Sequence, residues 1–139
     1  MNLRVPRVVG KVLMPFILLF ALYVQFHGDY GPGGGFQAGV IFAAGFVLYT
    51  LVFGSESTRR VLPMPVLIRL MALGVLIYLG TGVATMLLGG VFLDYDVLAG
   101  DPADGQHYGV LLVELGVGIT VASTVSAIFL GMLDRAGAR

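Results

Sequence analysis

The segment "HGDYGPGGGFQAG", residues 27–39, separates two long apolar stretches of the chain. Glycine is flexible and proline lacks the amide hydrogen that a helix interior needs, so this segment favours neither a helix nor a strand. Irregular backbone beside an apolar stretch is tolerated where it is buried in protein. We therefore predict an outer turn that closes a helical hairpin and packs against protein. The candidate loop and partner contacts are His27, Asp29, Pro32, Gly33, Gly34, Gly35, Phe36 and Gln37.

The composition indicates an integral membrane protein. The chain has 139 residues, of which 58% are hydrophobic and 12% are charged, whereas a soluble domain has about 25% charged residues. We therefore expect the lipid bilayer as a partner. The net charge of zero gives no long-range attraction to nucleic acid, so we expect no nucleic-acid partner.

Four apolar stretches cover residues 8–26, 36–53, 66–93 and 108–133 approximately. Each reaches the roughly 18–20 residues that a helix needs to cross about 30 Å of hydrocarbon. Helices are expected because lipid cannot satisfy free backbone groups, and the stretches do not alternate as porin strands do. We expect the first stretch to be retained, since no A-x-A cleavage pattern follows it. The prediction is an all-α membrane protein with four transmembrane helices in a single domain, residues 1–139.

The charges predict the orientation of these helices. The basic residues occupy the N-terminal region, the second loop with the start of the third helix, and the C-terminal region: Arg4, Arg7, Lys11, Arg59, Arg60, Arg69, Arg135 and Arg139. The first loop has none, and the third loop, "DYDVLAGDPADGQ", has four aspartates and no basic residue. Because cytoplasmic loops carry the excess of Lys and Arg, we predict that both termini are cytoplasmic.

Small residues recur every fourth position on two of the predicted helices. Gly35, Gly39 and Ala43 form one line, and Gly118, Ala122 and Ser126 continue from Glu114 to form another. Such lines let helix backbones approach closely in lipid, although glycine and alanine are also simply common in membrane helices. We interpret Gly39, Ala43, Gly118, Ala122 and Ser126 as helix-packing positions. Four helices with little extramembrane mass indicate a subunit that completes its packing against other chains.

Glu114 is the most informative charged residue. It lies about seven residues into the last apolar stretch, roughly 10 Å deep. A carboxylate there costs at least about 2.5 kcal/mol unless it is paired, hydrated or protonated. His107 lies seven residues earlier on nearly the same helix face, which would suit a proton relay. The alternative is that Glu114 hydrogen-bonds a neighbouring subunit and only holds the assembly; the sequence leaves both roles open.

No constellation of residues indicates an enzyme that acts alone. The chain has two histidines and no cysteine, which excludes thiolate chemistry and sulfur ligands. The histidine spacing matches no metal motif, and "GPGGGF" lacks the lysine of a phosphate-binding loop. We therefore predict no catalytic residue, no metal site and no cofactor.

The glycine segment resembles a signature of the MnhB family, which are small membrane subunits of the Mrp-type multisubunit sodium/proton antiporters. Members of that family carry a histidine-containing "P-G-G-G-F-Q-x-G" segment between their first two helices, here residues 32–39. A second stretch, "YGVLLVELGVGITV", residues 108–121, is similar to the family's last helix. One departure is that many members have a histidine where Asp29 stands, so a role of that histidine does not transfer to Asp29.

The resemblance implies a small multi-pass subunit in the inner (plasma) membrane of a prokaryote. Its complex would exchange cytoplasmic sodium ions for external protons, which supports pH homeostasis, with the other membrane subunits as partners. The MnhB-type subunit is needed for assembly or activity, while large subunits are thought to carry the main proton path. Two alternatives remain: the same module within an ion-pumping respiratory complex such as a membrane-bound hydrogenase, or a stand-alone small transporter.

Overall fold

The computed structural model describes residues 4–27, 34–98 and 100–137, and every long element in it is a helix. The elements are α1 (Arg4–His27), α2 (Gly35–Phe53), α3 (Ser55–Val61), α4 (Met64–Leu87), the 3-10 helix η1 (Tyr95–Leu98) and α5 (Pro102–Gly137). Helices α1, α2, α4 and α5 are long and apolar enough to cross a membrane. This confirms the predicted all-α fold with four membrane-spanning helices.

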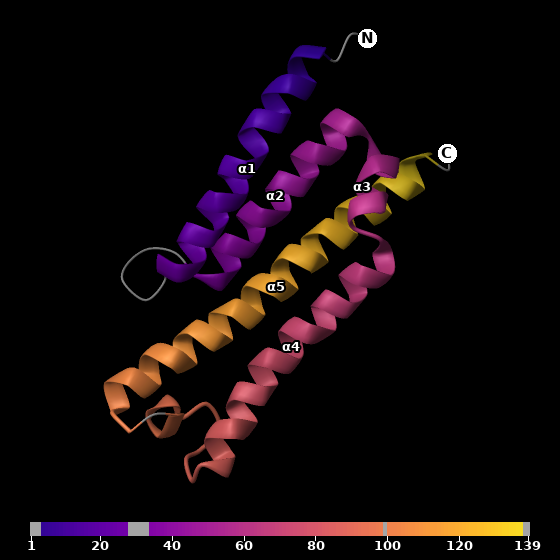
Figure 1. The fold of residues 1–139 in the computed structure, drawn as a ribbon. Coiled ribbons are helices and arrows are strands. Elements are labelled where there is room, and N and C mark those ends of the chain that lie inside the picture. The colour runs from indigo at the N-terminus through magenta and orange to yellow at the C-terminus, as the bar shows by residue number, and fades with distance from the viewer. Residues whose placement is uncertain (1–3, 28–33, 99, 138–139) are drawn as a thin grey trace.

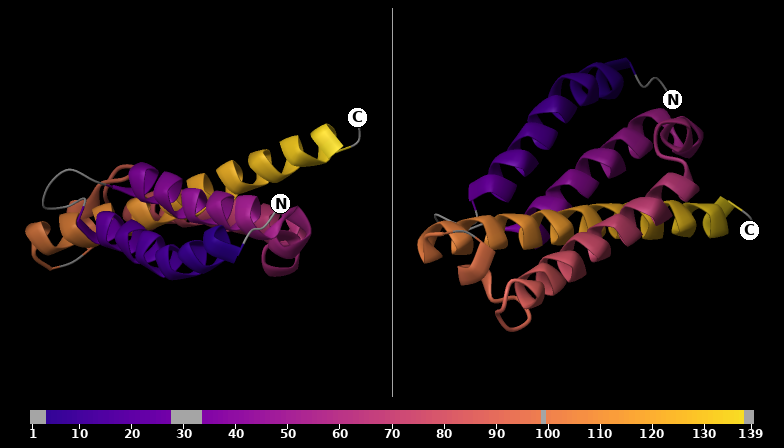
Figure 2. Two further views of the ribbon diagram at one scale, coloured as in Figure 1. Left: turned by 90° about the horizontal axis from the view of Figure 1, so that it is seen from above. Right: turned by 60° about the horizontal axis from the view of Figure 1, so that its bottom comes forward.

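Helix α5 is the central element of the bundle. It packs against both α2 and α4, while α1 packs chiefly against α2. Figures 1 and 2 show α5 between the α1–α2 hairpin on one side and α4 on the other. The beginning of α1, the short α3 and the end of α5 lie toward the same end of the molecule, and the end of α1 and the start of α5 lie toward the other.

Close backbone approach holds α5 to its neighbours. A Cβ atom on Gly39 of α2 would lie 2.8 Å from the carbonyl oxygen of Gly118, and one on Gly74 of α4 would lie 2.6 Å from that of Gly116. Both distances are shorter than real Cβ contacts, so these crossings need glycine. Ala43 is fully buried on the same side of α2. The helices therefore meet through small residues, as membrane helices commonly do.

The helix ends follow from glycine and proline. Helix α2 lies between Gly34 (φ 133°) and Gly54 (φ 94°), conformations that favour residues without a Cβ atom. Helix α4 begins directly after Pro63. It ends at Leu87 rather than near residue 93, because Gly89 has φ 95° and the amide of Gly90 turns back to the carbonyl of Thr85 at 3.0 Å.

The second loop contains α3, a short helix that the apolar pattern did not indicate. The hydroxyls of Thr50 and Thr58 form a buried hydrogen bond of 2.7 Å between α2 and α3. Arg59 forms an ion pair with Asp134 and donates to the carbonyl of Leu130 at 3.3 Å. These contacts attach α3 to the end of α2 and to the last part of α5.

The third loop folds over the start of α5. Gln106 Nε2 donates to Asp96 Oδ1 at 2.7 Å, and the backbone and ring of Tyr95 lie against Gly105 and Gly109. Burial, and secondarily the nearby Tyr78, raises the pKa of Tyr95 above that of an ordinary tyrosine. With four aspartates and no basic residue, this loop is acidic.

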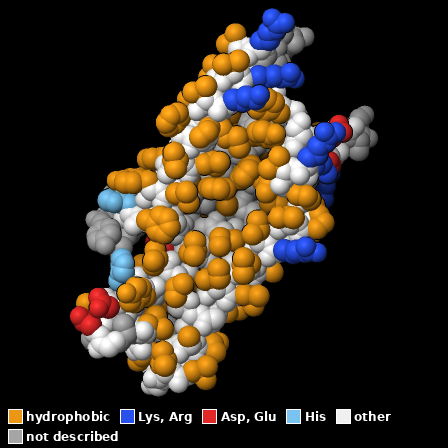
Figure 3. Space-filling model, viewed as in Figure 1, with side chains coloured by type: hydrophobic (Ala, Val, Ile, Leu, Met, Phe, Trp, Pro, Cys, Tyr) orange, Lys and Arg blue, Asp and Glu red, His pale blue; other side chains and the backbone are white. Residues whose placement is uncertain are grey.

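Charge and apolar surface are distributed as a membrane protein requires. Figure 3 shows Lys and Arg side chains gathered toward the end where α1 begins and α3 lies, with none at the opposite end of that face. Large apolar side chains point outward along the helices, for example Phe16 at 65% and Leu76 at 65% exposure. The charge distribution agrees with the positive-inside pattern, and the cytoplasmic position of the termini stays a prediction.

Candidate functional site

The carboxylate of Glu114 lies where α5 passes the beginning of α2. A Cβ atom on Gly34 would be 3.0 Å from Glu114 Oε1 and 3.3 Å from Gln37 Oε1. A Cβ atom on Gly35 would collide with the backbone carbonyl of Glu114. The paired glycines therefore allow α5 to bring its glutamate directly against the first turn of α2.

The start of α2 is a favourable place for this carboxylate. The first amide groups of a helix have no partner within the helix, and the helix dipole is positive at that end. Gly34 caps α2 with no side-chain hydrogen bond, and its carbonyl accepts from the amide of Ala38 at 3.0 Å. The Glu114 side chain is half-buried. The first turn of α2 thus offers the carboxylate positive potential where lipid would offer none.

Gln25 is a buried polar residue near this part of α5 that the sequence interpretation missed. It lies near the end of α1, is only 6% exposed, and its Oε1 touches Gly118, one helical turn from Glu114. Its Nε2 is enclosed and has no hydrogen-bond partner among the described residues. The available signal was its position: it is the one amide side chain in the first apolar stretch, two residues before the glycine segment.

The two histidines flank this region from different elements. His107 lies on α5, half-buried, with its ring 5.8 Å from that of Tyr108. Its seven-residue separation from Glu114 corresponds to a rise of about 10 Å, and both side chains lean the same way along the helix, so they cannot hydrogen-bond directly. His27 ends α1 and stacks on Tyr23, with ring centroids 5.1 Å apart. In the described ranges, no three acidic or histidine side chains form a metal-binding group.

The other sequence-predicted loop residues fall into two sets. Asp29, Pro32 and Gly33 lie outside the described residues. Phe36 is 61% exposed at the start of α2, where its ring is available to lipid or to another chain. Gln37 is also exposed.

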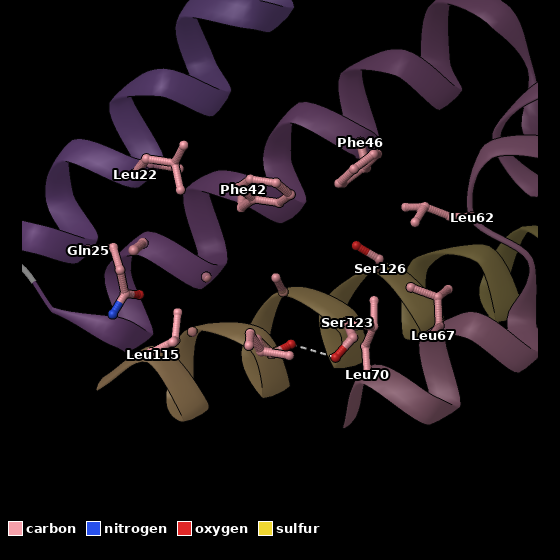
Figure 4. Close-up of a pocket in the computed structure, with 16 residues that line it drawn as sticks. Leu22, Gln25, Phe42, Phe46, Leu62, Leu67, Leu70, Leu115, Ser123 and Ser126 are labelled. Atoms are coloured by element: carbon pink, nitrogen blue, oxygen red, sulfur yellow. Dashed lines mark hydrogen bonds between the residues drawn. The ribbon is translucent and has the colours of Figure 1, made fainter. Parts of the chain in front are cut away.

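An apolar cavity of about 310 Å³ adjoins the site on its inner side. Its walls include Phe42 and Phe46 from α2 and Leu67 and Leu70 from α4, as Figure 4 shows. Gln25 stands at one end. The α5 side of the cavity includes the small residues Gly118, Ala122, Ser123 and Ser126. Ser123 is already satisfied, since its hydroxyl donates to the Ile119 carbonyl at 2.6 Å.

The arrangement defines a class of protein: a small multi-pass helical membrane protein with a carboxylate held within its helices. Comparison with known proteins then shows the family to which the chain belongs. The family described as "Domain related to MnhB subunit of Na+/H+ antiporter" matches residues 5–127. The chain belongs to this family, which confirms the resemblance given by the glycine segment. The family is a transporter component rather than an enzyme.

Two relatives from Staphylococcus aureus, strains Newman and JH1, carry the name "Putative antiporter subunit mnhB2". Each is 36% identical over 136 residues, which cover 96% of this chain and 94% of the relative. The similarity therefore extends over all four long helices.

Proposed function

We propose that this chain is a small membrane subunit of a multisubunit sodium/proton antiporter in the plasma membrane of a prokaryote. The family match over residues 5–127 supports a subunit role. The four apolar helices support a multi-pass position in the bilayer. The partners are the other membrane subunits of the antiporter, surrounded by lipid, and the transported species are sodium ions and protons.

Within that complex, we assign Glu114 to the ion path. The observation that supports this assignment is the position of its carboxylate against Gly34 and the first turn of α2. A carboxylate held beside the positive end of a helix can stay charged inside a membrane, and it can also accept a proton or bind a cation. The remaining role of the chain is structural, because exposed residues such as Phe36 face outward for contact with neighbouring subunits.

Glu114→Gln tests the assignment, because it keeps the size of the side chain and removes its charge and its titration. In membrane vesicles that carry the complete complex, we expect normal assembly by pull-down and a lowered or pH-shifted cation/proton exchange. The matched control is Glu56→Gln, because the Glu56 carboxylate on α3 is 87% exposed. Normal exchange by a normally assembled Glu114→Gln complex would remove Glu114 from the path. Loss of assembly would make its carboxylate a structural contact.

A further inference from the structure

The side-chain amide of Gln25 lies inside the helix bundle without a partner for its donor in the part of the chain that the structure describes. The residue is 6% exposed, and its Nε2 has no hydrogen-bond partner among the described residues. A buried amide of this kind is normally hydrogen-bonded, because leaving the donor unpaired costs its full desolvation free energy. We therefore expect that, in some state of the protein, the Gln25 Nε2 group donates to a hydrogen-bond acceptor.

The acceptor has to come from within this chain. Nε2 is enclosed by protein, so neither lipid nor a neighbouring subunit reaches it without a rearrangement. Backbone carbonyls in the middle of a helix already accept from the amide four residues later. Among the described residues at the start of α2, Glu114 and Gln37 each place a side-chain oxygen against Gly34.

The geometry favours Glu114 over Gln37. Gln25 Oε1 touches Gly118, and Glu114 lies four residues earlier on the same face of α5, where side chains are neighbours. Gln37, in contrast, is exposed at the rim of the site. A carboxylate is also the stronger acceptor, since hydrogen bonds to charged groups exceed those between neutral groups. Glu114 is thus the acceptor that would form the stronger hydrogen bond with the Gln25 amide.

We propose that Gln25 is a positioning residue for Glu114, donating a hydrogen bond from Nε2 to the Glu114 carboxylate when that carboxylate has released its proton. The proposal rests on the proposed function, in which Glu114 exchanges protons or cations. In the arrangement described here, Glu114 Oε1 lies on the Gly34 side. Gln25 supplies a second position for the same carboxylate, on the inner side of the first turn of α2 and next to the apolar cavity.

The groups around Glu114 that could also affect its protonation come from several elements. His27 ends α1, His107 lies on α5 itself, and Tyr78 lies on α4, which packs on another side of α5. Tyr49 is the titratable residue on α2 and lies about four turns beyond Gly35. The test must therefore measure the protonation of Glu114 itself rather than the pH dependence of transport by the whole complex.

A hydrophobic carbodiimide provides this test, because it modifies protonated carboxyl groups within membranes. The complete complex is labelled over a range of pH values, and modification of Glu114 is measured by mass spectrometry of its peptide. Gln25→Met keeps the length of the side chain and removes the donor. If the donor stabilises the carboxylate, we expect Gln25→Met to extend labelling by roughly one pH unit toward alkaline pH.

Two further variants make the result specific. Ser123→Ala removes another buried polar group on α5, whose hydroxyl donates to the Ile119 and Thr120 carbonyls of its own helix. Its labelling profile should therefore match that of the wild type. Gln25→Asn retains a donor on a shorter side chain, and its profile should lie between those of the wild type and Gln25→Met. Unchanged labelling in Gln25→Met, or an equal shift in Ser123→Ala, would overturn the proposal.

The labelling does not depend on transport, so the two proposals can fail separately. If Glu114→Gln leaves exchange intact while Gln25→Met shifts the labelling, Glu114 is outside the ion path but Gln25 still positions it. If Glu114→Gln abolishes exchange while Gln25→Met leaves labelling unchanged, the ion-path assignment holds and the positioning role is wrong. If Glu114→Gln leaves exchange intact and Gln25→Met shifts the labelling, the Gln25–Glu114 contact serves the structure rather than transport.

Discussion

Gly34 shows at the scale of one residue why the glycine segment has its composition. Its φ of 133° is disfavoured for residues with a side chain, and the space that a Cβ atom would fill borders the carboxylate of Glu114. Gly54 at the other end of α2 also has a positive φ, 94°, but nothing lies within 4 Å of its Cβ position. Comparing substitutions at the two glycines therefore distinguishes the effect of backbone strain, which both share, from the effect of the close approach of α5, which occurs at Gly34.

We expect Gly34→Ala to destabilise the protein more than Gly54→Ala does. Both substitutions introduce strain of about 1–3 kcal/mol at a positive φ. Gly34→Ala additionally places a methyl group 3.0 Å from Glu114 Oε1. The measurement is the melting temperature of the solubilised complex for the two variants and the wild type. Equal decreases would show that Glu114 does not rest against Gly34.

At the scale of elements, α4 and α5 are held together by direct backbone contact. The carbonyl oxygens of Gly116 and Gly74 each lie under 3 Å from the Cβ position of the other residue. Gly80, less than two turns further along α4, has nothing within 4 Å of its Cβ position. The packing therefore requires glycine at position 74 but not at position 80.

Gly74→Ala should lower stability by about 1–3 kcal/mol, because the methyl group meets backbone that cannot move aside without separating the helices. Gly80→Ala should be neutral or raise stability by about 0.5–1 kcal/mol, since alanine is the better helix residue. Thermal denaturation of the complex that carries each variant measures both effects. A loss with Gly80→Ala as large as that with Gly74→Ala would contradict this packing.

At the scale of the whole molecule, the distribution of charge predicts the orientation in the membrane. The basic residues gather toward the end where α1 begins and α3 lies, while the loop before α5 is acidic. Because the chain contains no cysteine, single cysteines can be introduced without background. Exposed positions are available at both ends, Glu56 on α3 and Asp104 at the start of α5.

Labelling with a membrane-impermeant maleimide on intact cells tests that orientation. We expect Asp104→Cys to react from outside, and Glu56→Cys to react only after the membrane is permeabilised, because positive loops stay in the cytoplasm. The control is the same pair after permeabilisation, where both should react. The reverse pattern would place the termini outside.

The hydropathy of the sequence by itself determined the number of spanning helices and their approximate positions, because bilayer thickness imposes a length that local composition reveals. The glycine and proline residues that bound the helices could also be read from the sequence, as at Gly54 and Pro63. The role of Glu114 stays a prediction. The end of α4 at Leu87 was less legible, since apolar residues continue past the glycines that end the helix.

Only the tertiary structure decided which residues meet. The contact between Gly34 and Glu114, the burial of Gln25 against Gly118, and the attachment of α3 through Arg59 all join positions far apart in the chain. Such contacts depend on the register at which helices cross, and that register is set by matched small residues on two helices rather than by either helix alone. The sequence therefore revealed the carboxylate of Glu114, whereas the fold revealed the buried amide of Gln25 against Gly118, one helical turn away.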